Sequence, residues 1–230
     1  MTLVLDKRIS RHYLELVNWA THQLAERDLT PSGTSGDVSL RDPQTGLIYV
    51  TGGHIDQPFP KNHFHEFSPQ DMAVFEPDGT RITPWSHTTI ELPMHLAIYR
   101  ARPDVHAIVH GHPKWSSVFA IVRRDIPLVL AEQWGNLKGE VKVAKYAPAG
   151  EMEMGDFVAE ALGDRNAVIM ANHGSVTVGP TFGVAFRHAH FLEQIAQKAI
   201  FAQLLGDAVT LDPESINAKA FMKGTSGSPE

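Results

Sequence analysis

The stretch Val105-His106-Ala107-Ile108-Val109-His110-Gly111-His112-Pro113 decides how the rest of the chain is interpreted. The apolar residues Val105, Ala107 and Val109 alternate with His106, Ile108 and His110 until Pro113 ends the run, which predicts a buried β-strand. Side chains on a strand repeat every two residues, so His110 and His112 should project from one face. Two imidazoles on one face of a stiff strand predict half of a metal site, because neutral imidazole binds zinc, manganese, cobalt or iron.

A second apolar run, residues 167–172, ends in His173-Gly174 and brings another histidine to the end of a strand. The three histidines predict a site for one divalent metal ion per chain. A rival His-x-His pair, His63 and His65, lies among prolines in a segment without strand periodicity. That pair is interpreted as a loop facing solvent or substrate, with a second metal site as the alternative.

The length of the chain and the absence of a break in its composition predict one domain, of the α/β or α+β class. The expected helices cover residues 9–27, about 90–101, 115–122, about 151–162 and about 182–205, and the expected strands cover about 38–40, 47–51, 72–75, 105–110, 141–146 and 167–172. A hairpin is expected after residues 72–75, with its second strand at 81–82. On the last helix, His188, His190 and Glu193 are interpreted as polar-face residues.

The composition of the chain narrows the classes of partner. With 230 residues, 20 basic and 26 acidic side chains and a net charge of -6, it gives no reason to expect nucleic acid or an anionic membrane as a partner. There is no cysteine, and no apolar run approaches the roughly 20 residues that span a bilayer. We expect a cytoplasmic enzyme for a small-molecule substrate, in a single domain over residues 1–230, with residues 222–230 a disordered tail.

Several residues near the predicted site have two interpretations. Glycine-rich loops at Gly36 and Gly52 could offer backbone amides to an oxyanion or simply form tight turns. Glu91 lies at the start of the central helix. Its carboxylate could take part in the reaction, interact favourably with the helix dipole, or form a capping box with Thr88. His95, one turn later, could face the site or pack, and His106 is expected to be a hydrogen-bonded core histidine.

Four motifs occur along the chain in a characteristic order: Glu91, Arg102-Pro103-Asp104, His110-Gly-His112 and Asn172-His173-Gly174. With these motifs in this order, the sequence resembles the class II aldolase/adducin family. The resemblance implies a three-layer α/β/α sandwich with a largely antiparallel central sheet, commonly a homotetramer with active sites near subunit interfaces. Members of the adducin type lack the metal histidines, whereas this chain keeps all three, which implies a catalytic member.

The resemblance also assigns roles. It makes His110, His112 and His173 the metal ligands and Glu91 the acid/base, and it implies zinc first, with manganese, cobalt or iron as alternatives. It implies contacts to substrate from the loops carrying Gly36, Asp37, Thr51 and Gly52, and from Thr89.

Three departures from the family pattern bear on the substrate. Asp37 replaces an asparagine, and its charge should repel phosphate; Thr89 is the one hydroxyl left where phosphate aldolases have paired serines. Ala131 stands where fuculose-phosphate aldolase has a proton-donating tyrosine, and Glu132 resembles the glutamate that dehydratase-type members place there.

The site predicts a divalent-metal-dependent lyase. It would break a carbon–carbon bond of a small polyoxygenated substrate, by retro-aldol cleavage or decarboxylation, through a metal-stabilised enediolate. Glu91 and Glu132 are the candidate catalytic residues. A metal-dependent dehydratase or epimerase of a sugar phosphate is the alternative, and a non-catalytic adducin-like assembly module is the third hypothesis.

Overall fold

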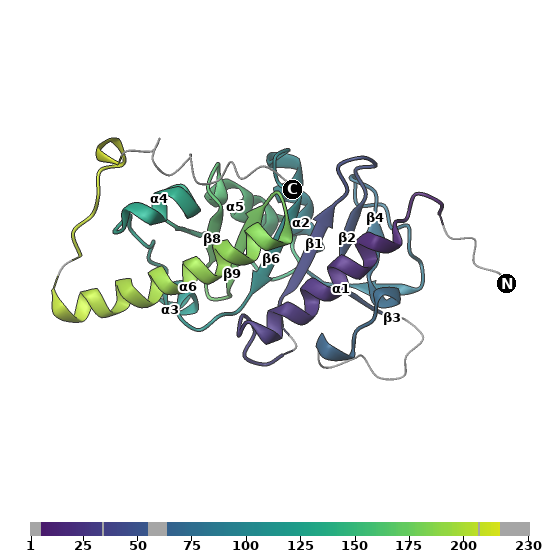
Figure 1. Ribbon diagram of the computed structural model, residues 1–230, viewed down its shortest axis with the longest axis horizontal. Helices are drawn as coiled ribbons and strands as arrows, with labels where there is room; N and C mark the ends of the chain where they lie inside the picture. Colours follow the sequence, from purple (N-terminus) through teal and green to yellow (C-terminus); the bar gives the residue numbers. More distant parts are fainter. Residues whose placement is uncertain (1–5, 34, 55–63, 207, 217–230) are drawn as a thin grey trace, which may run out of the picture.

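A computed structural model describes residues 6–33, 35–54, 64–206 and 208–216 (Figure 1). The predicted tail, residues 222–230, and His63 lie outside the described residues. Within the described part of the chain, no helix is both long and apolar enough to cross a membrane.

A seven-stranded sheet forms the middle of the molecule, in the order β4-β2-β1-β6-β9-β8-β7. Every neighbouring pair is antiparallel except β7 and β8, which run parallel. Two further strands, β3 and β5, pair in a small separate sheet. The strand bounds are β1 Asp37–Arg41, β2 Ile48–Val50, β3 Gly52–His54, β4 Ala73–Phe75, β5 Ser86–Thr88, β6 Ala107–Gly111, β7 Lys142–Ala144, β8 Ala167–Met170 and β9 Ser175–Gly179.

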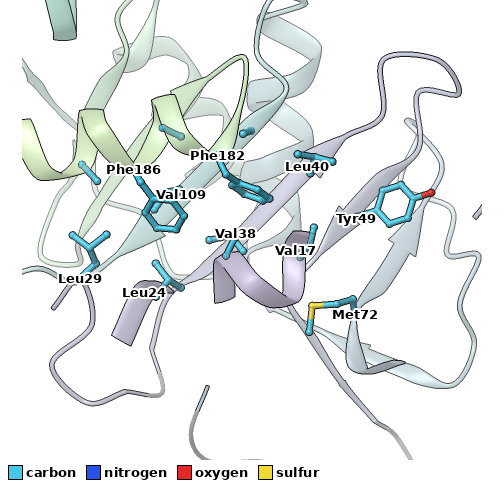
Figure 2. Close-up of a cluster of buried hydrophobic side chains, with 14 of the residues drawn as sticks. Val17, Leu24, Leu29, Val38, Leu40, Tyr49, Met72, Val109, Phe182 and Phe186 are labelled. Atoms are coloured by element: carbon cyan, nitrogen blue, oxygen red, sulfur yellow. The ribbon is translucent and has the colours of Figure 1, made fainter. Parts of the chain in front are cut away.

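Helices cover both faces of this sheet. Their bounds are α1 Arg11–Glu26, α2 Leu92–Ala101, α3 Ser116–Val122, α4 Ala131–Leu137, α5 Met152–Leu162 and α6 Phe182–Leu205, with short 3-10 turns η1 Phe64–Glu66, η2 Pro69–Asp71 and η3 Pro213–Ser215. Helices α1 and α6 cross the near face in Figure 1, and their apolar sides meet Val38 and Val109 of the sheet in the cluster of Figure 2. Helices α2 and α5 cover the other face through Met94, Val158 and their neighbours.

The arrangement confirms the predicted three-layer α/β/α sandwich with a largely antiparallel sheet. Several details differ from the sequence prediction. Helix α4 and strand β9 were not predicted, because α4 is seven residues long and contains Gly135, and β9 follows β8 after a short turn. Strands β3 and β5, of three residues each, were not predicted either. The hairpin expected after residues 72–75 is reduced to one bridge between Phe75 and Arg81.

One edge of the sheet gathers the residues of interest. Strand β1 runs antiparallel to β6 with Asp37 opposite His110, so β1 begins where β6 ends. Strand β9 lies between β6 and β8 and is antiparallel to both, so β8 ends at that same edge, just before His173. Residues that are far apart in the sequence therefore meet at one edge of the sheet.

Candidate metal centre

His110 lies in β6 and is fully buried. Its Nδ1 is 3.0 Å from the carbonyl oxygen of Ser175 on the neighbouring strand β9. A carbonyl can only accept, so Nδ1 carries a proton and donates it. This hydrogen bond fixes the orientation of the ring and directs Nε2 to the edge where the other histidines lie, as ligand histidines in metal sites are commonly held.

His112 and His173 complete a compact group of three imidazoles. The Nε2 atoms of His110 and His112 are 3.2 Å apart, and the three ring centroids are separated by 4.8 to 5.1 Å. The structure thus brings together His110, His112 and His173, the three histidines that the sequence singled out.

The turn Asn172-His173-Gly174 explains how His173 reaches His112. Asn172 has a positive φ of 54°, a conformation that asparagine tolerates better than most residues. Gly174 packs against the backbone oxygen of Gly111, and a Cβ at this position would lie 2.6 Å from the ring of His112. Only glycine allows this approach, which accounts for the His-Gly order in the sequence.

Glu91 faces the three histidines from the N-terminal end of α2, with a side chain that is 8% exposed. Its Oε1 lies 2.9 Å from His173 Nε2, and its Oε2 lies 3.0 Å from His110 Nε2. The alternative interpretation of a capping box with Thr88 was wrong, because the Thr88 hydroxyl has no hydrogen-bond partner among the described residues. Instead, the backbone N–H of Glu91 donates to Thr89 Oγ1 at 3.1 Å.

These four residues fit a divalent cation. One ligand atom from each of Glu91, His110, His112 and His173 lies within 4.8 Å of the others. Oε2 of Glu91 is buried but receives no donor in hydrogen-bond geometry among the described residues, despite its closeness to His110. Three imidazole nitrogens and a carboxylate oxygen form a donor set that suits zinc and other first-row metals.

Charges within this group also shift the pKa values of Glu91, His110 and His112. Burial alone would lower the pKa of His110, but the charge and close contact of Glu91, together with the charge of Asp37 and the bond to Ser175, raise that pKa to about 9. Burial and the neighbouring His110 lower the pKa of His112 to about 4, which keeps it neutral. Burial opposes ionisation of Glu91, yet the charge of His110 holds the pKa of Glu91 below its usual range.

Asp37 and Thr89, two of the predicted substrate-binding residues, are bonded to each other beside this cluster. Asp37 is 2% exposed; its Oδ2 accepts from the Thr89 hydroxyl, and its Oδ1 lies 2.7 Å from His95 Nε2. The other ring nitrogen of His95 is 2.6 Å from Ser39 Oγ, which in turn lies 2.8 Å from the Tyr99 hydroxyl. His95 therefore packs inward as part of a buried polar network.

The other predicted substrate-binding positions also have partners within the protein. Thr51 Oγ1 is buried and accepts from the Val38 amide at 3.0 Å. Gly36 has a φ of 98°, and a Cβ there would lie 2.7 Å from the His110 carbonyl oxygen. Gly52 is similarly enclosed by backbone, with the oxygen of His87 at 2.6 Å from such a Cβ. Close packing is sufficient to explain these residues, and a contact with substrate stays a prediction.

Glu132, the second predicted catalytic residue, does not join the cluster. It lies in the first turn of α4, half exposed, 3.9 Å from Lys198 of α6. Of the remaining histidines, exposed His65 lies in η1, outside the cluster. His106 is hydrogen-bonded as expected, through Nδ1 to the Arg41 carbonyl at 3.3 Å, although it is only partly buried.

The interpretation of two residues of the last helix was wrong. His188 is buried, and its Nδ1 donates to the Val178 carbonyl at 2.8 Å. Glu193 bonds the start of α3. Sequence spacing gave no signal for either contact, because the partners lie 10 and about 78 residues away along the chain.

Comparison with known proteins agrees with this geometry. Residues 15–200 match the profile of the Class II Aldolase and Adducin N-terminal domain. A 5-deoxy-D-ribulose 1-phosphate aldolase of Bacillus thuringiensis is 28% identical over 82% of this chain and 86% of its own length. An L-fuculose phosphate aldolase of Methanococcus maripaludis is 30% identical over 72% of this chain and 84% of its own. A solved L-fuculose 1-phosphate aldolase superposes with a TM-score of 0.84 at 29% identity, covering 93% of this chain and 98% of that one.

The chain therefore belongs to the class II aldolase/adducin family. The family resemblance predicted from the sequence is confirmed. The predicted enzyme class, a lyase that cleaves carbon–carbon bonds, is confirmed as well by relatives that are named aldolases.

Proposed function

We propose that the chain is an aldolase that cleaves a short ketose, with one divalent cation held by His110, His112 and His173. The observation that carries this proposal is the cluster in which these three side chains and Glu91 place four ligand atoms within 4.8 Å. The relatives named above act on deoxyribulose and fuculose phosphates, so these sugar phosphates are the first substrates to test.

The cation would supply positive charge beside the carbonyl and hydroxyl oxygens of the substrate when it is bound. Zinc is our first choice, and manganese, cobalt and iron are the alternatives that imidazole ligands also suit. His110 is oriented for this role by its Nδ1 hydrogen bond to Ser175, and the low pKa of His112 keeps that ring available as a neutral ligand.

We assign the proton transfer to Glu91. Its carboxylate is buried, its backbone is held by the Thr89 hydroxyl, and it lies within 3.0 Å of two of the proposed metal ligands. A base in this position can take a proton from a substrate hydroxyl and return it to the carbon that is released, and such transfers contribute about 10² to 10⁴ in rate.

The surroundings of Asp37 bear on whether the substrate carries a phosphate. Asp37 was expected to repel phosphate, but both oxygens of its carboxylate are bonded, to His95 and to Thr89. This bonding turns the acceptor atoms of Asp37 toward the protein. We therefore include sugar phosphates and their unphosphorylated counterparts as paired substrates in the assay.

Glu132 supported the alternative of a dehydratase, and its position bears on that hypothesis. In its own chain it faces Lys198 on α6 and is not part of the four-residue cluster. If Glu132 takes part in the reaction, we propose that it does so in the site of a neighbouring subunit of a homotetramer.

The test is an assay for cleavage products. The purified chain is loaded with Zn²⁺ or Mn²⁺ and incubated with L-fuculose 1-phosphate, 5-deoxy-D-ribulose 1-phosphate and the two free sugars. We expect two smaller carbonyl products from at least one of these, loss of that activity in Glu91→Gln, and unchanged activity in His190→Ala, whose side chain is exposed on α6. Loss of water from these substrates without carbon–carbon cleavage would instead favour the dehydratase.

A further inference from the structure

Helix α3 begins four residues after the proposed ligand His112 and receives no hydrogen bond from the side chain of its own N-cap residue, Trp115. The first amides of a helix have no partner within the helix and need an acceptor from elsewhere. The position of these amides matters here, because the short link from His112 to α3 helps to determine where the His112 ring lies.

Glu193 of α6 supplies that acceptor. Its Oε2 accepts from the Trp115 amide and its Oε1 from the Ser116 amide, each at 2.7 Å. Both carboxylate oxygens are used, and hydrogen bonds to an ionised acceptor at the start of a helix are the stronger kind. Glu193 therefore joins the long helix α6 to the segment that carries His112.

A second path leads from the same contact to His110. The Ser116 hydroxyl donates to Ser175 Oγ at 3.4 Å, and the Ser175 carbonyl oxygen accepts from His110 Nδ1 at 3.0 Å. Ser116 is fully buried and Ser175 is 5% exposed, so water has little access to these bonds. The chain of contacts thus runs from Glu193 through Ser116 and Ser175 to the ring of His110.

We propose that Glu193 is a positioning residue for the metal centre, which fixes His112 through the start of α3 and His110 through Ser116 and Ser175. This inference rests on the proposed function only in taking those two histidines as ligands. Groups that orient metal ligands from behind are typically worth about 10-fold to 100-fold in metal affinity. We expect a loss within this range in Glu193→Ala and a smaller loss in Glu193→Gln, which keeps one acceptor oxygen.

The first experiment measures the dissociation constants of Zn²⁺ and Mn²⁺ by chelator competition on the full chain. It compares wild type, Glu193→Ala and Glu193→Gln with the control Glu160→Gln, an exposed carboxylate on α5. Urea unfolding of the metal-free proteins is measured in parallel. Weaker metal binding in the order Ala, then Gln, with the control unchanged, supports the proposal. Loss of stability with metal affinity within twofold of wild type would overturn it, because a purely structural cap would do only that.

A second measurement does not depend on metal. Imidazole ¹⁵N chemical shifts of metal-free wild type and Glu193→Ala should differ at His110 and His112 and agree at His190. If those two rings are unmoved, the inference fails. If wild type binds no metal at all, the proposed metal centre fails, and the imidazole shifts still decide whether Glu193 positions the two rings.

Discussion

Removing His95 should expose how strongly the buried pair with Asp37 is coupled. His95→Leu leaves a side chain of similar bulk in a fully buried position and deletes the N–H that lies 2.7 Å from Asp37 Oδ1. Asp37 is 2% exposed, so water cannot replace the lost donor. Breaking one side of a buried ionisable pair costs about 3–5 kcal/mol, because the remaining group stays desolvated.

The double variant Asp37→Val/His95→Leu provides the sharper test. It removes both polar groups together, so no unpaired carboxylate remains, and apolar replacement of a buried pair is often close to neutral. Ser39 keeps its contact with Tyr99, and Thr89 loses the acceptor of its hydroxyl. We expect the double variant to be about 2 kcal/mol more stable than His95→Leu alone, within the usual range for residues in one network.

Urea unfolding of the metal-free proteins measures these free energies, with Asp37→Val completing the cycle. The control is His190→Ala, which should lie within about 0.5 kcal/mol of wild type because its side chain is exposed. If the effects of the two single changes add, so that the double variant is the least stable of all, Asp37 and His95 are not the coupled pair described above.

Four further predictions concern the cluster itself. Glu91→Gln should lower kcat by about 10² to 10⁴ with KM changed only a few fold, as measured in steady-state kinetics; an unchanged kcat would remove Glu91 from the reaction. Metal affinity should fall as pH drops below about 9, by up to about tenfold per unit, because a cation must displace the proton that His110 carries below its raised pKa. Chelator competition across pH 6 to 9 tests this. The raised pKa of His110 also stabilises the metal-free protein fully below its ordinary value of 6.5, and this contribution should be lost as pH rises through about 9, which urea unfolding across that window measures. Metal at about 100 times its dissociation constant should add about 2.7 kcal/mol to the free energy of unfolding of wild type and nothing to that of His110→Ala.

The strand that carries His110 could be predicted because its information is local. Alternation of apolar side chains and the terminating Pro113 determine the strand, and the two-residue period places His110 beside His112. His173 could be placed by the same signal at the end of a second strand. The long helix α6 was predicted with its observed bounds, because its periodic run is closed by Gly206.

The partners of those residues could not be predicted, since they depend on contacts between distant segments. In the sequence, Asp37 is a charged residue in a glycine-rich loop. Only the pairing of β1 with β6 brings it beside His95 and Thr89. The spacing of Glu193 along its helix is that of a surface residue. Its contact with α3 follows only from the packing of α3 against α6. Hydrophobic periodicity reports which face of an element is buried, but it does not report which polar groups meet there.

The most direct test of the proposed metal centre is elemental analysis of the purified protein. Wild type is compared with His110→Ala and His173→Ala, and with His190→Ala as the control from the exposed face of α6. We predict about one equivalent of divalent metal in wild type and in the control after reconstitution, as expected for a single cluster of ligands, and loss of that metal in the first two variants. Metal that remains in His110→Ala and His173→Ala, or a wild type that binds none, would contradict the three-histidine centre and the aldolase mechanism built on it.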